Sequence, residues 1–505
     1  VHRATSQWFI SMEKKDLRQK ALKAISETAF YPERGRDRIR SMIETRPDWC
    51  ISRQRIWGVP LPLFVSKKNN EPLKDPDVIE NIARIYEKEG ADCWFTDDPQ
   101  KFLGKKYKKE DFVKSSDIVE VWFDSGATHS YVLEKRKDLT WPASMYLEGS
   151  DQHRGWFHSS LLESCGTRGK APFKSILTHG FVVDGKGLKM SKSTGNIIAP
   201  EDVLKKYGAD ILRTWVAASD YAEDLRLDYS ILEQHAESYR KIRNTLRFLL
   251  GNLRDQKINF DLNSKEIDKW PELEQFMLHQ IFSLNKNFEK YFKEYNFHKL
   301  YKELLNFCSL DLSAFYFDIR KDTLYCDDIK SKKRETCVNF LSLVLDLLLK
   351  WLAPILSFTT EEVFQILNQN KNSSIHLETF PKIPTKWENQ QLFQKWDKLK
   401  IIRSVANAAI EIKRSSKDIG SSLEADIEIY LNKEYLDIVS NVDLSDYFIT
   451  SKAQAKPMVE NDKLFSLEDV SGIKVLVKKA EGRKCSRCWK ILNNSCERNN
   501  CGLKN

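Results

Sequence analysis

The sequence contains no apolar stretch long enough to cross a lipid bilayer. Its most apolar segment, residues 338–352, is interrupted by Asp346 and Lys350 and is followed by Pro354, whereas a spanning helix needs about 20 consecutive, mainly apolar residues. We therefore predict a buried bundle helix here and no membrane partner. A basic, then apolar, then small-residue leader is also missing from the start of the chain, so we expect a cytoplasmic rather than a secreted protein.

The composition argues against a disulfide-rich or a disordered class. Only 10 of the 505 residues are cysteine, and 41% hydrophobic with 30% charged residues is typical of a soluble globular protein. The length exceeds what one hydrophobic core supports, which favours several domains of roughly 100–200 residues each. A net charge of +9 suits a polyanionic partner without identifying one.

The hydrophobic pattern divides the chain into four parts. Residues 1–228 alternate short apolar runs with turns and helical segments, which is typical of α/β structure, and the polar residues 66–115 form a predicted surface insertion there. Residues 229–385 have a helical period and predict an all-α bundle. Strand-like alternation then predicts a small mixed domain at residues 386–480, which leaves residues 481–505 as a tail. The expected fold class is multidomain α/β plus all-α.

Two lysines, Lys189 and Lys192, stand in the segment Lys-Met-Ser-Lys-Ser, which precedes Gly195 and a helix start at Pro200. A loop of this kind can fold over ATP and place ammonium groups against the charge that builds on a departing pyrophosphate. The alternative is an ordinary solvated basic turn, because five residues can match a motif by chance.

Residues 148–157 combine acidic side chains with glycine just before a predicted helix. Carboxylates at such a turn could hold an amine and ribose hydroxyls, and glycine lets the backbone approach a ligand closely. Taken alone, a polar helix start at the surface is the better explanation. The candidate binding residues here are Glu148, Gly149, Asp151 and Gln152.

Two further blocks, residues 48–58 and 122–126, pair aromatic bulk with charge. Trp122 in the second block and Trp156 in the acidic segment are candidates for the walls of an apolar pocket. By themselves, tryptophans of this kind are more often core residues than pocket walls. Their assignment therefore depends on the neighbouring motifs.

A basic stripe runs along the first helix predicted for the bundle, on a different face from its apolar residues. Its members are Arg240, Arg243, Arg247 and Arg254, of which the first three are the candidates for tRNA binding. Facing RNA phosphates, they would supply salt-dependent affinity that is largely independent of sequence. A solvated basic helix face explains any single arginine equally well.

Four cysteines, Cys485, Cys488, Cys496 and Cys501, fall within 17 residues of the tail. Thiolates at such spacings can hold a tetrahedral structural zinc ion and fasten a segment that has no core of its own. The alternative is a frayed tail that carries free thiols.

Taken in this order, these blocks resemble the bacterial isoleucyl-tRNA synthetases from one end of the chain to the other. Valyl and leucyl enzymes have similar blocks, but Cys50, residues 151–156 and the cysteine tail favour the isoleucyl family. The resemblance implies the second half of a Rossmann-type class I catalytic domain, a helical anticodon-binding bundle, and a small mixed domain with a zinc-binding tail. That family closes with two Cys-x2-Cys pairs, so the four residues between Cys496 and Cys501 depart from its pattern.

The resemblance also implies substrates and residue roles. The substrates are ATP with magnesium, isoleucine and tRNA(Ile), with one structural zinc ion and a monomeric protein. Lys192 binds ATP beside Lys189, and His179 lies near the adenine. Trp122 and Trp156 flank the isoleucine side chain. The remaining residues contact the aminoacyl-adenylate, Glu148 directly and the others toward the ribose, namely Gly149, Asp151 and Gln152.

Two features of that family are missing from the chain. A pocket discriminates one methylene by only about 1–3 kcal/mol, a limit for which isoleucine and valine in this very family are the standard illustration, so the family edits with a second domain. Residues 2–9 match the return from that domain, and most of it is expected to lie outside this sequence. No His-x-Gly-His occurs among the nine histidines, so we expect the chain alone to be unable to form the adenylate.

The expected function is that of the full-length parent, which activates isoleucine with ATP to isoleucyl-adenylate and transfers it to the 3′ end of tRNA(Ile). One alternative is a noncatalytic tRNA-binding module, against which the intact lysine loop argues. The other is a valyl or leucyl sibling, against which the cysteine tail argues.

Overall fold

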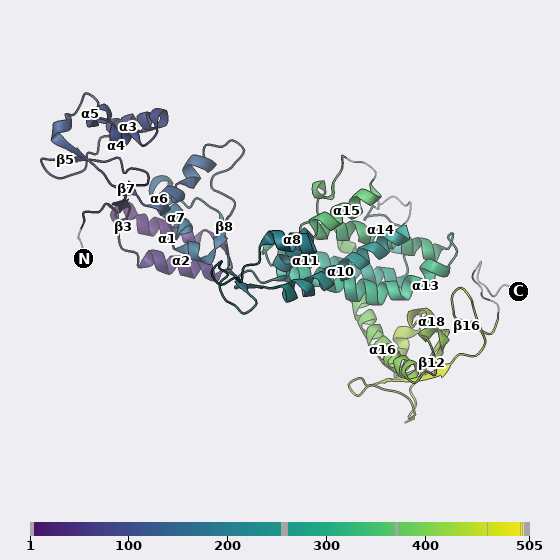
Figure 1. The fold of residues 1–505 in the computed structure, drawn as a ribbon. Coiled ribbons are helices and arrows are strands. Elements are labelled where there is room, and N and C mark those ends of the chain that lie inside the picture. The colour runs from purple at the N-terminus through teal and green to yellow at the C-terminus, as the bar shows by residue number, and fades with distance from the viewer. Residues whose placement is uncertain are drawn as a thin grey trace. The chain divides into compact units, whose positions relative to one another are not determined.

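The computed structural model describes residues 5–253, 261–368, 372–461, 463–494, 496 and 498. The chain divides into two compact units, Val1–Val183 with Tyr221–Leu225, and Asp184–Asp220 with Arg226–Asn505. Each unit has a hydrophobic core of its own, and Figure 1 follows the order of their elements by colour.

A three-stranded parallel sheet forms the centre of the first unit. Its strand order is β2 (Ala29–Tyr31), β9 (Ser175–His179) and β8 (Tyr146–Gly149), so the carboxyl ends of all three strands lie at one edge. Helix α7 (Trp156–Arg168) connects β8 to β9, α1 (Leu17–Ser26) precedes β2, and α2 (Arg34–Glu44) follows it. Apolar side chains of these elements, such as Ile25, Phe157 and Ile176, form the core.

Short antiparallel pairs accompany this sheet. They join β1 (Phe9–Ile10) to β3 (Trp49–Cys50), and β4 (Ser52–Arg53) to β7 (Ile118–Val119). Helix α6 (Val121–Gly126) follows β7 and packs on α7. The chain leaves the first unit within β10 (Val182–Asp184), returns for Tyr221–Leu225 and leaves it again within β11 (Leu225–Leu227).

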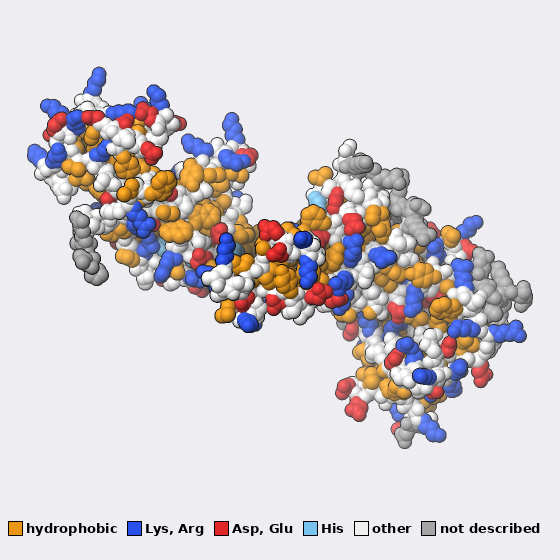
Figure 2. Space-filling view, in the orientation of Figure 1, with side chains coloured by type: hydrophobic (Ala, Val, Ile, Leu, Met, Phe, Trp, Pro, Cys, Tyr) orange, Lys and Arg blue, Asp and Glu red, His pale blue; other side chains and the backbone are white. Residues whose placement is uncertain are grey.

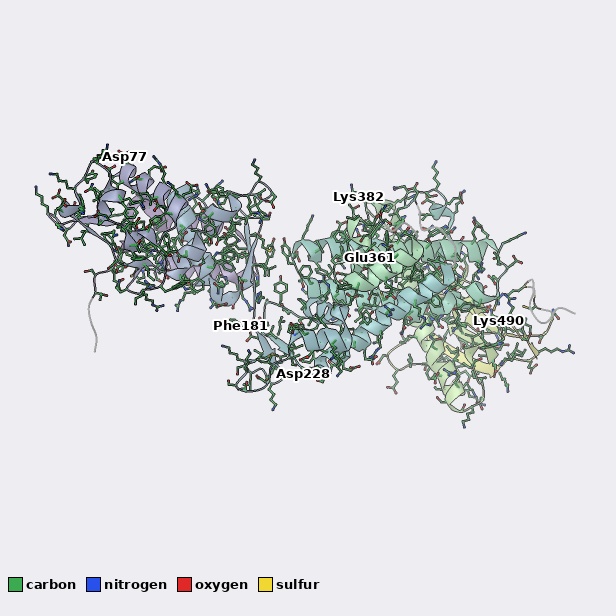
Figure 3. The ribbon with its side chains drawn as sticks, turned by 45° about the horizontal axis from the view of Figure 1, so that its top comes forward. Asp77, Phe181, Asp228, Glu361, Lys382 and Lys490 are labelled. Carbon is green, nitrogen blue, oxygen red and sulfur yellow. The ribbon has the colours of Figure 1, made fainter. Side chains whose placement is uncertain are left out.

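A small subdomain with its own core interrupts the first unit between β4 and β7. It contains a hairpin of β5 (Phe64–Ser66) and β6 (Phe112–Lys114) with helices α3 (Pro76–Glu89), α4 (Cys93–Thr96) and α5 (Pro99–Leu103). Its core is centred on the fully buried Trp94. Helix α3 begins where the Asp75 carboxylate accepts the N–H of Asp77, which is labelled in Figure 3.

The second unit is mainly helical. Helix α8 (Pro200–Tyr207) begins with proline and two acidic residues and ends at Gly208 with φ of 85°. The helices that follow are α9 (Ala209–Ala218), α10 (Tyr229–Leu253), α11 (Glu272–Lys293), α12 (Phe297–Asn306), a π-helical stretch at Phe307–Phe317, α13 (Asp318–Cys326), α14 (Lys332–Leu352) and α15 (Ser357–Leu367). Most side chains of α14 are buried, as predicted for a bundle helix, and no helix in the described part of the chain is long and apolar enough to span a membrane.

The long helix α16 (Gln390–Ser415) leads into a three-stranded sheet. Its order is β13 (Lys452–Pro457), β12 (Ala425–Leu431) and β14 (Ile473–Lys479), with β12 parallel to β13 and antiparallel to β14. Side chains of β12 are alternately buried and partly exposed, which is the strand period that the sequence predicts. The short helices α17 (Lys433–Val439) and α18 (Leu444–Tyr447) complete this part, and β15 (Arg483–Lys484) and β16 (Ile491–Leu492) lie in the tail.

Candidate functional site

The acidic turn, which lies within residues 148–157, follows β8 at the carboxyl edge of the parallel sheet. Glu148 and Gly149 end β8 and are paired with Thr178 and His179 at the end of β9. Open α/β sheets bind ligands in the crevice outside this edge. Glu148 is exposed there, whereas Gly149 is buried. A Cβ on Gly149 would stand 2.7 Å from Asp151 Oδ1, so glycine keeps the turn compact.

Hydrogen bonds fix the turn between β8 and α7. Gln152 Nε2 donates to Asp151 Oδ2 at 3.0 Å, and Gln152 Oε1 accepts the N–H of Trp156 at 3.1 Å. His153 is buried, with Nδ1 2.7 Å from Ser150 O. The exposed Asp151 carboxylate is therefore held by its neighbours and remains accessible to a ligand with hydroxyl or amine donors.

The two candidate pocket tryptophans meet at Gly155. Trp156 is held firmly, because its ring stacks on Tyr146 at 4.1 Å with an interplanar angle of 5° and its Nε1 donates to Ser125 O at 2.9 Å. Trp122 on α6 is 42% exposed, and its six-membered ring lies 3.0 Å from where a Cβ on Gly155 would stand. The structure thus brings both tryptophans to the N-terminus of α7, directly after the acidic turn.

His179 lies beside Gly149 at the same edge. Its Nδ1 is 2.7 Å from Gly180 O, which favours the tautomer that keeps the proton on Nδ1 and leaves Nε2 as an acceptor. A side chain on Gly180 would collide with the backbone of Glu223. The edge of the sheet therefore gathers seven of the predicted site residues, Trp122, Glu148, Gly149, Asp151, Gln152, Trp156 and His179.

A pair of carboxyl groups near this edge was not predicted from the sequence. Burial, together with the charges of Asp124 and Glu120, raises the pKa of Glu163 on α7 from an ordinary value of 4.5 to about 9. Burial likewise raises the pKa of Asp124 to about 6. Glu163 is flanked on α7 by residues that are buried in the structure, and no sequence motif marks it. Protonated at neutral pH, Glu163 adds no charge beside Gly126 of α6, against which its carboxyl group packs.

The lysine loop belongs to the second unit and follows β10. Lys189 and Lys192 are exposed, and neither side chain has a hydrogen-bond or ion-pair partner among the described residues. Gly195 has φ of 67° and donates its N–H to Lys192 O at 3.3 Å, a turn that favours glycine. Both ammonium groups are thus available for an anionic ligand.

Three of the four predicted arginines lie on α10 and differ in their surroundings, and Arg254 lies outside the described residues. Arg240 forms ion pairs with Glu233 and Glu237. Arg243 forms a bidentate pair with Glu362, with hydrogen bonds of 2.9 and 3.2 Å. Arg247 has no such partner in the described part of the chain. Figure 2 shows basic and acidic side chains interspersed over the visible face of this unit rather than in one basic stripe.

Arg247 borders a cavity of about 370 Å³ between α10 and α13. The cavity is also lined by Asn244, Gly251 and Asn252 of α10 and by Tyr325 of α13, whose side chain is 57% exposed. A cation, two amides and an exposed aromatic ring are groups that suit an unstacked nucleotide. The sequence showed the arginine but not the tyrosine, which comes from another helix.

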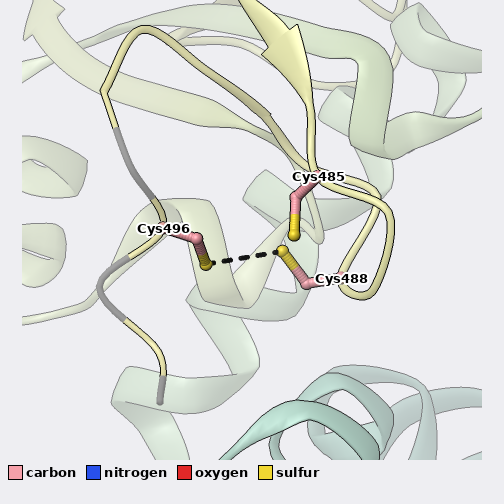
Figure 4. A group of neighbouring side chains, drawn as sticks. All are labelled: Cys485, Cys488 and Cys496. Carbon is pink, nitrogen blue, oxygen red and sulfur yellow. Dashed lines mark hydrogen bonds between the residues drawn. The ribbon is translucent and has the colours of Figure 1, made fainter. Parts of the chain in front are cut away.

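Three of the four tail cysteines converge (Figure 4). The sulfur atoms of Cys485, Cys488 and Cys496 lie within 4.8 Å of one another, and all three residues are buried. The Sγ atoms of Cys488 and Cys496 are 4.0 Å apart. Cys501 lies outside the described residues. Three convergent thiols with no disulfide between them fit a thiophilic metal ion such as zinc.

The tail packs against the end of α13. Arg487 Nη2 donates to Tyr325 O at 3.1 Å, and Arg498 forms ion pairs of 2.6 and 2.9 Å with Asp322 and Asp327. Cys326 packs on the cysteine cluster. The cysteine cluster is thereby fixed beside the cavity that Arg247 and Tyr325 line.

Two family models match the chain. One, described as class I tRNA synthetases (I, L, M and V), matches residues 1–228, and the other, the anticodon-binding domain of tRNA ligase, matches residues 274–429. The chain is therefore a class I aminoacyl-tRNA synthetase sequence. This confirms the predicted combination of an α/β part with a helical part.

Curated relatives narrow the assignment. The isoleucine–tRNA ligase of Pelagibacter ubique (strain HTCC1062) is 64% identical over 99% of this chain and 54% of its own length. That of Mesorhizobium japonicum is 46% identical over 97% of this chain and 50% of its own length. The chain belongs to the isoleucine–tRNA ligase family and spans about half the length of these relatives.

The solved structure of Mycobacterium tuberculosis methionyl-tRNA synthetase bound by methionyl-adenylate has a similar fold. Its TM-score is 0.51 at 15% identity, covering 75% of this chain and 67% of that one. This likeness bears on the fold alone.

Proposed function

We propose that this chain is part of an isoleucine–tRNA ligase that forms isoleucyl-adenylate from isoleucine and ATP and transfers the isoleucyl group to tRNA(Ile). The family assignment supports the reaction. The observation that carries the proposal is the edge of β8, where an exposed carboxylate, a fixed acidic turn and two tryptophans lie together. Residues 1–228 would supply this half of the catalytic domain.

In this proposal the apolar residues at the edge of the sheet bind the isoleucine side chain, and the polar residues bind the ammonium group and the ribose. The faces of Trp122 and Trp156 take the aliphatic side chain of isoleucine, Glu148 takes the ammonium group, and Asp151 and Gln152 take ribose hydroxyls. His179 would accept a hydrogen bond from the adenine amino group through Nε2. Gly149 leaves the backbone accessible for close approach.

Lys189 and Lys192 would bind the triphosphate and stabilise the negative charge that develops on pyrophosphate as isoleucine attacks the α-phosphate. Magnesium would accompany ATP as part of the substrate. Lys192→Ala should then slow adenylate formation far more than it weakens isoleucine binding, because the lysine acts on the leaving group.

The helical part would bind tRNA through its anticodon arm. Arg247, with no acidic partner in the described part of the chain, is the best placed of the three arginines, whereas Arg240 and Arg243 are partly neutralised by glutamates. Tyr325 would stack on a base at the cavity that Arg247 borders. A zinc ion held by Cys485, Cys488 and Cys496, with Cys501 as the proposed fourth ligand, would fix the tail beside that cavity.

The test is isoleucine-dependent ATP/pyrophosphate exchange by the purified chain, alone and after addition of the remaining half of a related isoleucine–tRNA ligase. We expect no exchange by the chain alone and exchange that prefers isoleucine to valine and leucine after complementation. Exchange by the chain alone would overturn the proposed dependence on the missing half. Binding of tRNA without any exchange in the complemented protein would favour a noncatalytic tRNA-binding module.

A further inference from the structure

The lysine loop is exposed to solvent, yet a single amide side chain organises it. Asn196, half-buried at the end of the loop, donates through Nδ2 to Asp184 Oδ2 at 2.8 Å and to Lys189 O at 3.3 Å. Its Oδ1 accepts the N–H of Ser191 at 2.9 Å and the hydroxyl of Thr194 at 2.6 Å. Only this orientation of the amide satisfies all four partners.

Asp184 is the matching anchor at the other end of the loop. Its Oδ1 accepts the N–H groups of Lys186 at 3.0 Å and Leu188 at 2.8 Å, while Oδ2 faces Asn196. Its own N–H donates to Leu188 O at 2.9 Å. Asp184 is the last residue of β10, and its carboxylate therefore bonds both to the turn that follows the strand and to Asn196 at the other end of the loop.

We propose that the hydrogen bond between Asn196 and Asp184 is a clasp that closes residues 185–195 into a preformed loop and sets the backbone conformation from which Lys189 and Lys192 reach phosphate. This inference rests on the proposed function of the two lysines. A loop ordered by its own side chains does not have to be ordered by ATP, so less of the binding free energy is lost when the nucleotide binds. Asn196 and Asp184 are positioning residues, because they act through the lysines.

The chain permits a reciprocal exchange of the two residues. Asn196→Asp places two carboxylates against each other and removes the donor, so the loop should open. Combining it with Asp184→Asn restores the donor and acceptor between the two side chains, although not the hydrogen bond to Lys189 O, and returns the net charge to that of the unsubstituted chain. The amide oxygen that Asp184→Asn introduces can still accept the N–H groups of Lys186 and Leu188.

The first readout uses the complete chain and does not depend on activity. Trypsin cleavage after Lys189 and Lys192 is measured by mass spectrometry relative to cleavage after Lys68, an exposed lysine of the first unit. We expect Asn196→Asp and Asn196→Ala to accelerate loop cleavage about tenfold or more, since each loses a hydrogen bond to a charged group. The double exchange should restore most of the protection. Unchanged cleavage in Asn196→Asp, or no recovery in a double variant with a normal melting temperature, overturns the clasp.

The second readout is isoleucine-dependent exchange in the complemented protein. Asn196→Ala should lower kcat while the KM for isoleucine stays the same, and the double exchange should recover kcat. Loop opening without loss of kcat would overturn the link between the clasp and the lysines. Absence of exchange in every version, including the unsubstituted one, would count against the proposed function, while the trypsin result still decides whether the clasp exists.

Discussion

Gly155 lies directly against the indole of Trp122, and a Cβ on Gly155 would stand 3.0 Å from Cη2 and 3.1 Å from Cζ3 of that ring. Such distances are shorter than ordinary carbon–carbon contacts of about 3.5–4.0 Å. The same Cβ would stand 2.6 Å from Gln152 Oε1. A methyl group at this position would therefore displace both the Gln152 amide and the Trp122 ring.

Gly155→Ala should therefore reduce isoleucine use in the complemented protein by about tenfold or more, since small misplacements of binding groups are costly. The measurement is kcat/KM for isoleucine in ATP/pyrophosphate exchange. Adding Trp122→Phe, which removes the outer ring, should restore part of the loss. Gly166→Ala is the matched control on the same helix, because its Cβ meets only Leu17 at an ordinary 3.7 Å. Equal losses in both glycine variants would contradict the prediction.

Glu163 should make the first unit less stable as pH rises. Its pKa is raised to about 9 in the folded protein. At any pH between the ordinary carboxyl pKa and about 9, folding therefore takes up a proton. The stability that Glu163 contributes is complete below the unfolded pKa and is lost as pH rises toward 9, at up to about 1.4 kcal/mol per pH unit.

Glu163→Gln mimics the protonated acid and should slow hydrogen–deuterium exchange of α7 amides at pH 8 relative to the unsubstituted chain. At pH 5 the two should be alike. Glu80→Gln, at an exposed glutamate of α3, is the control. It should leave the hydrogen–deuterium exchange of α7 unchanged at both pH values. A stabilisation by Glu163→Gln that is the same at both pH values would show that titration is not its cause.

The ion pair between Glu274 on α11 and Arg320 on α13 should be essential to the helical part. Arg320 donates from Nε and Nη2 at 2.7 and 2.8 Å, Tyr316 donates to the same carboxylate at 2.9 Å, and Glu274 is 1% exposed. Removing one partner of a buried pair costs about 3–5 kcal/mol, and the lower end of that range applies here because Asp446 Oδ2, 3.4 Å from Arg320 Nη1, still compensates part of the arginine charge. Glu274→Ala should lower the free energy of unfolding by that amount in urea titrations, whereas Glu266→Ala, in an exposed pair with Lys269, should cost less than about 1 kcal/mol.

Arg247 and Arg240 should differ in their contribution to RNA binding. Arg247→Ala should weaken binding of an anticodon stem–loop and reduce the slope of log affinity against log salt concentration by about one. Arg240→Ala should have the smaller effect, because Glu233 and Glu237 already neutralise that charge. Fluorescence anisotropy at several salt concentrations measures the affinity and its salt slope. Equal slopes for the two variants would contradict the prediction that Arg247 binds phosphate and Arg240 does not.

Metal removal should release the tail from α13. The purified chain is expected to hold one zinc ion, and chelation or Cys485→Ser should remove it and increase hydrogen–deuterium exchange at the end of α13, where Arg487 and Arg498 are bonded. Cys50→Ser, in the first unit, is the control that should keep the metal. Full metal content in Cys485→Ser would show that this thiol is not a ligand.

The sequence by itself determined the features that depend on neighbours along the chain. The strand period of residues 425–431, the buried character of α14 and the class I motifs all follow from local pattern, because side-chain alternation and helical spacing are set by the backbone. The cysteine spacing predicted a thiol cluster for the same reason, and three of its members converge.

Only the tertiary structure decided the features that depend on residues far apart in sequence. Glu362, 119 residues from Arg243, neutralises that arginine, so the predicted basic stripe is not uniformly available to phosphate. Tyr325 joins Arg247 from another helix, and burial against α6 makes Glu163 a neutral acid. The charge and accessibility of these groups depend on solvent exclusion and on distant partners, which a linear pattern does not specify.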